Sequence, residues 1–348
     1  MLRETIATLR HSNYLTILLI MVISTQSINS VFQAWTPDPQ PDYNLVVLPS
    51  VKGCDVLQYP QTENNQLLPN GTVIDTHTKQ PSRDPLKWWM NCLSYQATGS
   101  PKLIPIFFNL ALMPLVYLLT LQLTKDKLIS FIAFTAFFFN PLYKDWINSG
   151  TYDQVWSFFL ILSVYVNFKF RNTANSIVLF LVSLTAKPLG ILYIPSILYG
   201  LKDNKTYIGI TTLLLLGVIA GIIVSVVIFY PEKITHALGG SIKLNLDYQH
   251  AFTDNFGMLA YEIPFLMIFG YVSWKYSPKQ PSPIRKLCAV WMINAWLTTT
   301  IIYLFSTQFQ FVYRFVPLAV FMSIFIAITI NDVGKWYIES KLNQVDDK

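Results

Sequence analysis

Charge is the scarcest property of this sequence. Only 13% of its 348 residues are Asp, Glu, Lys or Arg, whereas a soluble globular domain carries about a quarter. Hydrophobic residues make up 53% of the chain. These two numbers exclude an ordinary soluble domain and predict an integral membrane protein, with the lipid bilayer as its first partner.

Metal ligands are also few. The four histidines are scattered and the sequence has no Asp-x-Asp pair, so we predict no zinc site and no dedicated metal site. The net charge of +6 does not call for nucleic acid as a partner. Lys and Arg residues that keep loops on one side of a bilayer explain this charge more simply.

Long apolar runs occupy most of the chain. Because about 20 apolar residues are needed to cross the hydrocarbon core, we expect an all-α fold, a polytopic transmembrane helical bundle of about 10 spans. The expected spans are 13–32, 103–123, 128–143, 153–168, 174–186, 189–201, 207–230, 258–274, 287–305 and 309–330. The fifth and sixth, separated by "AKPLG", are either two crossings or one broken or re-entrant element.

The Lys and Arg residues of the loops predict the orientation of these spans. Fifteen of them fall in segments that are cytoplasmic if the N-terminus is inside, and four fall in the short outer loops. The positive-inside rule then places both termini in the cytoplasm. We expect the protein to lie in the plasma membrane. The expected organisation is an N-terminal transmembrane helix (1–32), a long outer first loop (33–102), a multi-span membrane domain (103–335) and a cytoplasmic tail (336–348).

The first apolar run has an alternative interpretation as a cleaved signal peptide. Its basic start and short apolar core fit both interpretations. The sequence that follows, "STQSINSVFQAW", contains no small-x-small cleavage site, so we favour a retained span.

The outer loop holds two of the three cysteines, Cys54 and Cys92. Two cysteines in one outward loop can pair in an oxidising compartment, so we predict a disulfide between them. Cys288 stands alone within a span.

Four ionisable residues lie within or at the ends of expected spans: Asp153, Lys187, Glu262 and Arg314. Charges at membrane depth usually face a bundle interior or a wet cavity, which makes them functional candidates. Asp153 has a structural alternative, since an acid is favourable in the first turn of a helix. Lys187 and Arg314 have another, because long cationic side chains near span ends can extend to the interface.

The outer side of the bundle thus combines acids from loops with cations at helix ends. Such a pocket suits a phosphate-linked lipid substrate whose tail stays in the bilayer. The cations would hold the phosphate and a carboxylate would deprotonate an acceptor hydroxyl. Sugar transfer from a lipid phosphate uses this geometry.

Four segments, in order, resemble membrane glycosyltransferases of the GT-C fold, in particular the branch of the protein O-mannosyltransferases and the aminoarabinose lipid A transferase. The stretch "SRDPLKWWMNCLSYQATG" is similar to the family's Lys-Pro-Pro-Leu-x-x-Trp region, with Asp84 at its turn and Trp88 and Trp89 at its aromatics. "SGTYDQVW" resembles the start of the family's fourth span. "LTAKPLG" is similar to its Leu-Thr-Lys-Gly-Pro element, and "YRFVP" to its late Arg-Tyr-x-Leu-Pro span.

The resemblance implies a polyprenyl-phosphate sugar as donor and a lipid, glycan or protein as acceptor on the outer side. It implies that the general base is Asp42 or Asp38, although "TPDPQPDYN" lacks the Glu of the family's acidic motif. Asp153 would position a head group, while Lys187 and Arg314 would neutralise the donor phosphate. The pocket would include four further residues, Asp84, Trp88, Trp89 and Glu262. No cofactor is required, although a divalent cation is compatible with such donors.

Two other classes of protein share some of these features. A transporter or flippase of lipid-linked compounds also has broken helices and charges at membrane depth, but it would normally show internal repeats, and the two halves show none. A non-catalytic GT-C-like subunit of a membrane complex would use the same charges for assembly. The sequence does not identify the sugar or the acceptor.

Overall fold

The computed structural model describes residues 13–36, 51, 66–67, 73–74, 85–144, 147–148, 154–200, 262–276, 282–305 and 316–346. These residues are almost entirely helical, as the sequence predicts. One pair of two-residue strands was not expected: β1 (Gln66–Leu67) lies antiparallel to β2 (Val73–Ile74) within the predicted outer loop. It adds no layer to the helical bundle.

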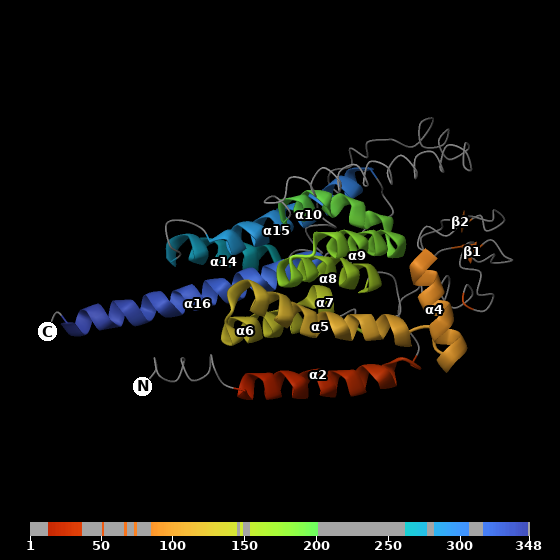
Figure 1. Ribbon diagram of the computed structural model, residues 1–348, viewed down its shortest axis with the longest axis horizontal. Helices are drawn as coiled ribbons and strands as arrows, with labels where there is room; N and C mark the ends of the chain where they lie inside the picture. The colour runs from red at the N-terminus through yellow and green to blue at the C-terminus, as the bar shows by residue number, and fades with distance from the viewer. Residues whose placement is uncertain are drawn as a thin grey trace.

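Most of the described helices overlap expected spans, and Figure 1 shows their arrangement. They are α2 (Tyr14–Gln33), α4 (Pro85–Thr98), α5 (Leu103–Thr124), α6 (Lys127–Phe138), α7 (Pro141–Lys144), α8 (Gln154–Phe170), α9 (Thr173–Ala186), the 3-10 helix η2 (Pro188–Tyr193), α10 (Ile194–Gly200), α14 (Glu262–Tyr276), α15 (Pro283–Phe305) and α16 (Val316–Asp346).

Three of the described helices are long and apolar enough to cross a membrane: α2, α5 and the part of α16 from Val316 to Ser340. The helices α6, α8, α9 and α10 are apolar but shorter. The expected span 207–230 lies outside the described residues. The structure therefore agrees with a helical membrane protein.

Short polar turns set the boundaries of the helices. α5 ends at Lys125, which has the left-handed backbone conformation (φ 59°) common after a helix C-terminus. The side chain of Asp126 then accepts hydrogen bonds from the backbone N–H groups of Leu128 and Ile129 and caps the start of α6. Asn172 caps α9 in the same way, through the N–H of Asn175.

The centre of the bundle is α5, which packs against α2, α6 and α8. Two buried hydrogen bonds join Asn109 of α5 to residues that follow α6. The Tyr143 hydroxyl donates to the backbone carbonyl oxygen of Asn109 (2.7 Å), and the Asn109 side-chain amide donates to the carbonyl oxygen of Ile147 (2.9 Å). The Gln122 amide donates to the carbonyl oxygen of Phe168 (3.0 Å). This contact joins the ends of α5 and α8, so the two helices run in the same direction.

The helix α4 lies across one end of the bundle and crosses the direction of α5 (Figure 1). Three hydrogen bonds join the end of α2 to the segment between α4 and α5. The Trp35 indole donates to the carbonyl oxygen of Thr98 (3.2 Å), the Ser100 hydroxyl donates to that of Ala34, and the buried Lys102 ammonium donates to that of Thr36 (2.6 Å). We call this the outer end, following the topology that the sequence predicts.

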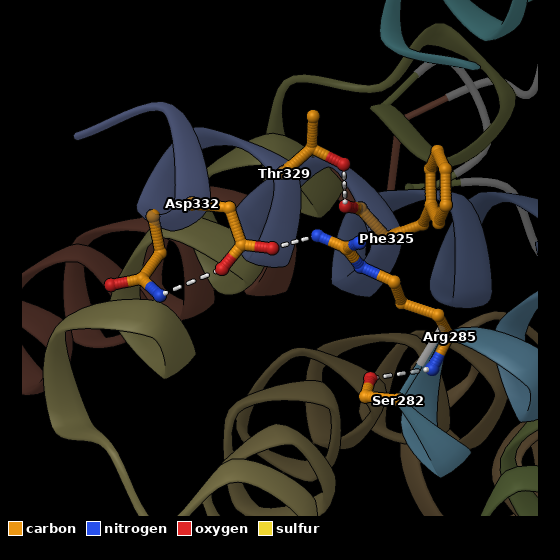
Figure 2. A network of polar contacts seen from close by, with 6 residues as sticks. Ser282, Arg285, Phe325, Thr329 and Asp332 are labelled. Atoms are coloured by element: carbon orange, nitrogen blue, oxygen red, sulfur yellow. Dashed lines mark hydrogen bonds and ion pairs between the residues drawn. The ribbon is translucent and has the colours of Figure 1, made fainter. Parts of the chain in front are cut away.

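An ion pair between Arg285 and Asp332 joins α15 to α16 (Figure 2). The two side chains are only 6% and 16% exposed. Arg285 precedes the expected span 287–305, and burial lowers the pKa of its guanidinium because desolvation disfavours the charged form. The Ser282 hydroxyl accepts a hydrogen bond from the backbone N–H of Arg285 (3.3 Å) and so caps α15.

Two segments differ in detail from the expected spans. The expected span 128–143 is divided into α6 and α7, because the Asn140 side chain accepts a hydrogen bond from the N–H of Leu142 and starts a new helix. The last helix does not end near 330 but continues as α16 into the expected tail, to Asp346.

Candidate functional site

Lys187 lies at the tip of a helical hairpin. α9 ends at Ala186, Lys187 has an extended backbone (φ −159°, ψ 116°), and Pro188 begins η2. The N–H of Lys187 donates to the carbonyl oxygen of Ser183 (2.9 Å), and the carbonyl oxygen of Lys187 accepts from the N–H of Gly190 (3.1 Å). The lysine side chain is half-buried.

The start of α9 and the end of α10 form the two feet of this hairpin, and both are hydrogen-bonded to one residue of α8. Asn167 accepts a hydrogen bond from the Thr173 hydroxyl at the start of α9 (3.4 Å) and donates one to the carbonyl oxygen of Gly200 at the end of α10 (3.3 Å). The chain therefore runs out along α9, reverses at Lys187 and returns through η2 and α10. With 14 residues, α9 carries Lys187 about 21 Å from the feet of the hairpin.

Close packing against α8 holds the tip of the hairpin. A Cβ atom at Gly190 would lie 2.9 Å from Leu184 and 3.8 Å from the ring of Trp156, so the return segment touches both α9 and the first turn of α8. On the other side, the Asn294 amide of α15 donates to the carbonyl oxygen of Leu192 (3.1 Å).

A column of aromatic rings runs beside the return segment and into α16. Trp156 lies 5.7 Å from Tyr193, Tyr193 lies 5.7 Å from Trp291, and Trp291 stacks on Phe321 at 4.5 Å between ring centroids. All four side chains are fully buried. Because α8, η2, α15 and α16 each contribute one ring, the column fixes the position of the hairpin relative to three other helices.

Several buried polar atoms near this hairpin have no hydrogen-bond partner among the described residues. They are the indole nitrogens of Trp156 and Trp291 and the hydroxyl oxygens of Ser157 and Ser196. Buried polar groups are nearly always paired with protein, water or ligand. These four groups lie along the hairpin and the helices packed against it, and none has its hydrogen bond satisfied within the described residues.

The predicted pocket aromatics lie on α4. The Trp89 side chain is on an exposed face and 51% accessible, whereas for Trp88 the structure describes only its place in the helix. Glu262 is the first residue of α14, and its side chain is likewise not described. The remaining predicted site residues lie outside the described part of the chain: Asp38, Asp42, Asp84, Asp153 and Arg314.

The cysteines agree with an oxidised outer loop. Cys92, on the buried side of α4, is disulfide-bonded. Cys288 is a buried free thiol in α15. The predicted partner of Cys92 is Cys54, which lies outside the described residues, so that pairing stays a prediction.

Within the described ranges, no group of three or more His, Cys, Asp or Glu residues lies close enough together to hold a metal ion. The predicted catalytic and pocket carboxylates are outside these ranges, or in the case of Glu262 lack a described side chain. The predicted absence of a dedicated metal site therefore stays a prediction.

Sequence reasoning missed the buried polar residues of α4, of which Asn91 is the clearest. The sequence alone predicts a loop over residues 85–98, yet Asn91, Ser94 and Thr98 follow helical spacing within "NCLSYQAT". This spacing is the signal that could have identified them, since residues three and four apart share one face of a helix.

Comparison of the chain with protein-family models, with curated proteins and with solved structures found no match.

Proposed function

We propose that this protein is a membrane glycosyltransferase that moves a sugar from a polyprenyl-phosphate donor to an acceptor on the outer side of the plasma membrane. In this proposal the chain has about ten membrane-embedded segments, two of which are the α9 and α10 arms of the hairpin, and both termini lie in the cytoplasm. The observation that carries it is the position of Lys187, half-buried at the tip of a hairpin that enters the bundle between α8 and α15.

Exposed aromatic side chains support this placement in a bilayer. Trp35 and Trp89 are exposed at the outer end, and Trp274, Trp336 and Tyr337 are exposed on α14 and α16. Tryptophan and tyrosine favour the two membrane–water interfaces. Between them, α2 presents a row of exposed apolar side chains over 20 residues, or about 30 Å, which matches the thickness of the hydrocarbon core.

Basic residues support the proposed orientation. The α5–α6 turn contains Lys125 and Lys127, and the α8–α9 turn contains Lys169 and Arg171. The ends of α5 and α8 are joined by a hydrogen bond, so these four cations gather at the end opposite α4. Under the positive-inside rule this end is the cytoplasmic one.

The location of Lys187 fits a phosphate-binding role. The hairpin enters from the cytoplasmic end, and its length of about 21 Å brings the lysine into the outer half of a hydrocarbon core of about 30 Å. A cation there is stabilised by the C-terminal dipole of α9. It is placed to attract the phosphate of a lipid whose tail remains in the bilayer.

The chemistry assigned to the site is a single displacement at the anomeric carbon, with polyprenyl phosphate as the leaving group. The acceptor hydroxyl loses its proton to Asp42 or Asp38 as the new glycosidic bond forms. Lys187 and Arg314 stabilise the charge that develops on the departing phosphate. Asp153 and the aromatics of α4 contribute to the pocket for the sugar and the acceptor.

The proposal is tested by incubating the purified protein with a panel of labelled polyprenyl-phosphate sugars and measuring release of polyprenyl phosphate. With the donor that the protein uses, Lys187→Ala should lower transfer by about ten- to a hundredfold, because a desolvated phosphate loses a charge-assisted contact of roughly 1.5–3 kcal/mol.

A matched control is Lys144→Ala, since Lys144 is exposed on α7 and removal of its charge should leave transfer within about twofold of the unmodified protein. If no donor in the panel is consumed, the proposed activity is wrong. If a donor is consumed and both lysine variants are equally active, Lys187 has a structural role only.

A further inference from the structure

The helix α4 buries polar side chains and exposes large apolar ones. Asn91 and Ser94 are completely buried beside the apolar Met90, whereas Trp89 and Leu93 are 51% and 41% exposed. Exposed tryptophan and leucine side chains on a helix that lies across the end of an apolar bundle suit a position at a membrane interface.

Two of the inner polar side chains are used by the protein itself. The Ser94 hydroxyl donates to the carbonyl oxygen of Ser100 (2.6 Å) and accepts from the N–H of Ile104 (3.2 Å). The Thr98 hydroxyl accepts a hydrogen bond from the backbone N–H of Ser100 (3.2 Å). Both residues therefore fasten α4 to the segment that leads into α5.

Asn91 is different, because neither atom of its amide has a hydrogen-bond partner among the described residues. A buried amide offers two N–H donors and an acceptor oxygen, and leaving all of them unpaired is strongly unfavourable. The protein retains an asparagine at a position with an exposed fraction of 0%, where an apolar residue of the same size would be more stable.

The same end of the bundle contains Lys187. α4 packs against α5 and α9. α9 runs antiparallel to α8, as the hydrogen bond from the Ser176 hydroxyl to the carbonyl oxygen of Ser163 (2.8 Å) indicates. Its last residue therefore lies at the end that α4 covers, where the return segment of the hairpin packs against Trp156 at the start of α8.

We propose that the Asn91 amide binds hydroxyl groups of the donor's sugar, while Lys187 holds the phosphate to which that sugar is attached. This inference rests on the proposed function and adds a sugar-recognising residue to it. An amide suits the role because it can donate to one hydroxyl and accept from its neighbour. Asn91 takes no part in proton transfer and acts by holding the sugar.

The decisive variant is Asn91→Leu, which keeps the size of the side chain and removes its polar atoms. Because the amide has no hydrogen-bond partner among the described residues, this change should leave the melting temperature unchanged or raise it. Transfer from the donor should nevertheless fall by about ten- to a hundredfold. A rise in stability together with a loss of activity is not expected for a residue that only supports the fold.

Asn109→Leu is the matched control. Asn109 is also buried, but its amide donates to the carbonyl oxygen of Ile147 at 2.9 Å. The substitution should therefore lower the melting temperature, with transfer per folded molecule kept within about threefold.

Ligand-induced stabilisation separates the sugar contact from the phosphate contact. Sugar-free polyprenyl phosphate should raise the melting temperature of Asn91→Leu as much as that of the unmodified protein. The sugar-bearing donor should add further stabilisation only where Asn91 is present. Lys187→Ala should lose the response to both lipids.

The outcomes distinguish this inference from the proposed function. If the unmodified protein consumes a donor while Asn91→Leu either melts lower, as Asn109→Leu does, or transfers normally, then the sugar-binding role is wrong and the activity stands. If the unmodified protein neither consumes nor is stabilised by any donor, the proposed function is wrong and the sugar-binding role falls with it.

Discussion

The Arg285–Asp332 pair gives the sharpest test of the packing of α15 on α16. The substitution Asp332→Ala leaves the guanidinium of Arg285, which is only 6% exposed, without its carboxylate. Breaking a buried ion pair by removing one partner costs about 3–5 kcal/mol. We expect the free energy of unfolding to fall by this amount.

The magnitude follows from the burial of both partners. An ion pair in water contributes about 0–1 kcal/mol, because solvent and salt screen it. With side chains 6% and 16% exposed, the Arg285–Asp332 pair is closer to the buried limit, where the larger part of the effect is the desolvation of the remaining charge. The loss of stability expected for a buried pair is several-fold larger than that for an exposed pair, so the measured free energy of unfolding distinguishes the two cases.

A double substitution tests the cause of the loss. Replacing both partners with apolar residues of similar size, as in Arg285→Met with Asp332→Leu, removes the buried charge together with its partner. Such replacements are often neutral or stabilising, so the double variant should be more stable than Asp332→Ala. The neighbouring Lys286 is exposed, and Lys286→Ala should change stability by less than about 0.5 kcal/mol.

The assay is equilibrium unfolding of the purified protein in mixed micelles, followed by circular dichroism. A loss of less than about 1 kcal/mol in Asp332→Ala would show that water reaches the pair. Equal losses in the single and double variants would show that the side-chain volume matters and the charge does not. Either result would refute desolvation of Arg285 as the cause of the expected loss.

Two further predictions concern the outer loop and the topology. Single cysteines at Asn65 and Gln280, introduced into a chain without native cysteines, should react with an impermeant reagent in intact cells at the first position only; reaction at the second would reverse the orientation, which rests on the distribution of Lys and Arg. Cys54 and Cys92 should be recovered as one cross-linked peptide by mass spectrometry without reductant, and closing a loop of about 40 residues should stabilise the protein by roughly 3–4 kcal/mol in the chain-entropy model. Recovery of both as free thiols would contradict the pairing.

Helix positions were largely predictable from the sequence, because they depend on local features. The expected span 103–123 became α5 (Leu103–Thr124), and 174–186 became α9 (Thr173–Ala186). Each is an apolar run with polar residues at its ends, and the capping side chain of Asn172 adjoins the second run in the sequence.

The candidate site was predictable in part. Lys187 stands out in the sequence because a charge inside an apolar run is rare enough to require a reason. The break at "AKPLG" was also visible, since proline ends one helix and glycine permits close approach. Whether the chain continued in one direction or turned back at this break depended on where it went next. The contacts of Asn167 with Thr173 and Gly200 show that it turns back, which excludes a single broken crossing.

The role of α4 was not predictable, because its sequence has no long apolar run. The burial of Asn91 and Ser94 depends on the bundle against which α4 packs, so the sequence could not reveal it. Ser94 and Asn91 have similar surroundings in the sequence, yet the first is fully paired with the turn before α5 and the second is unpartnered among the described residues. That difference depends on which backbone groups come within about 3 Å, and the sequence does not specify this distance.

By itself, then, the sequence determined the helical membrane class, the approximate positions of most described helices and the residues whose charge needs an explanation, since each of these depends on composition or on neighbours within one helical turn. Only the tertiary structure decided that Lys187 is the tip of a hairpin, that Arg285 is paired with Asp332 across 47 positions of the chain, and that Asn91 is buried beneath the end of the bundle. The physical reason is that burial and pairing arise between segments that are distant in sequence, and the packing of the helices brings these segments together.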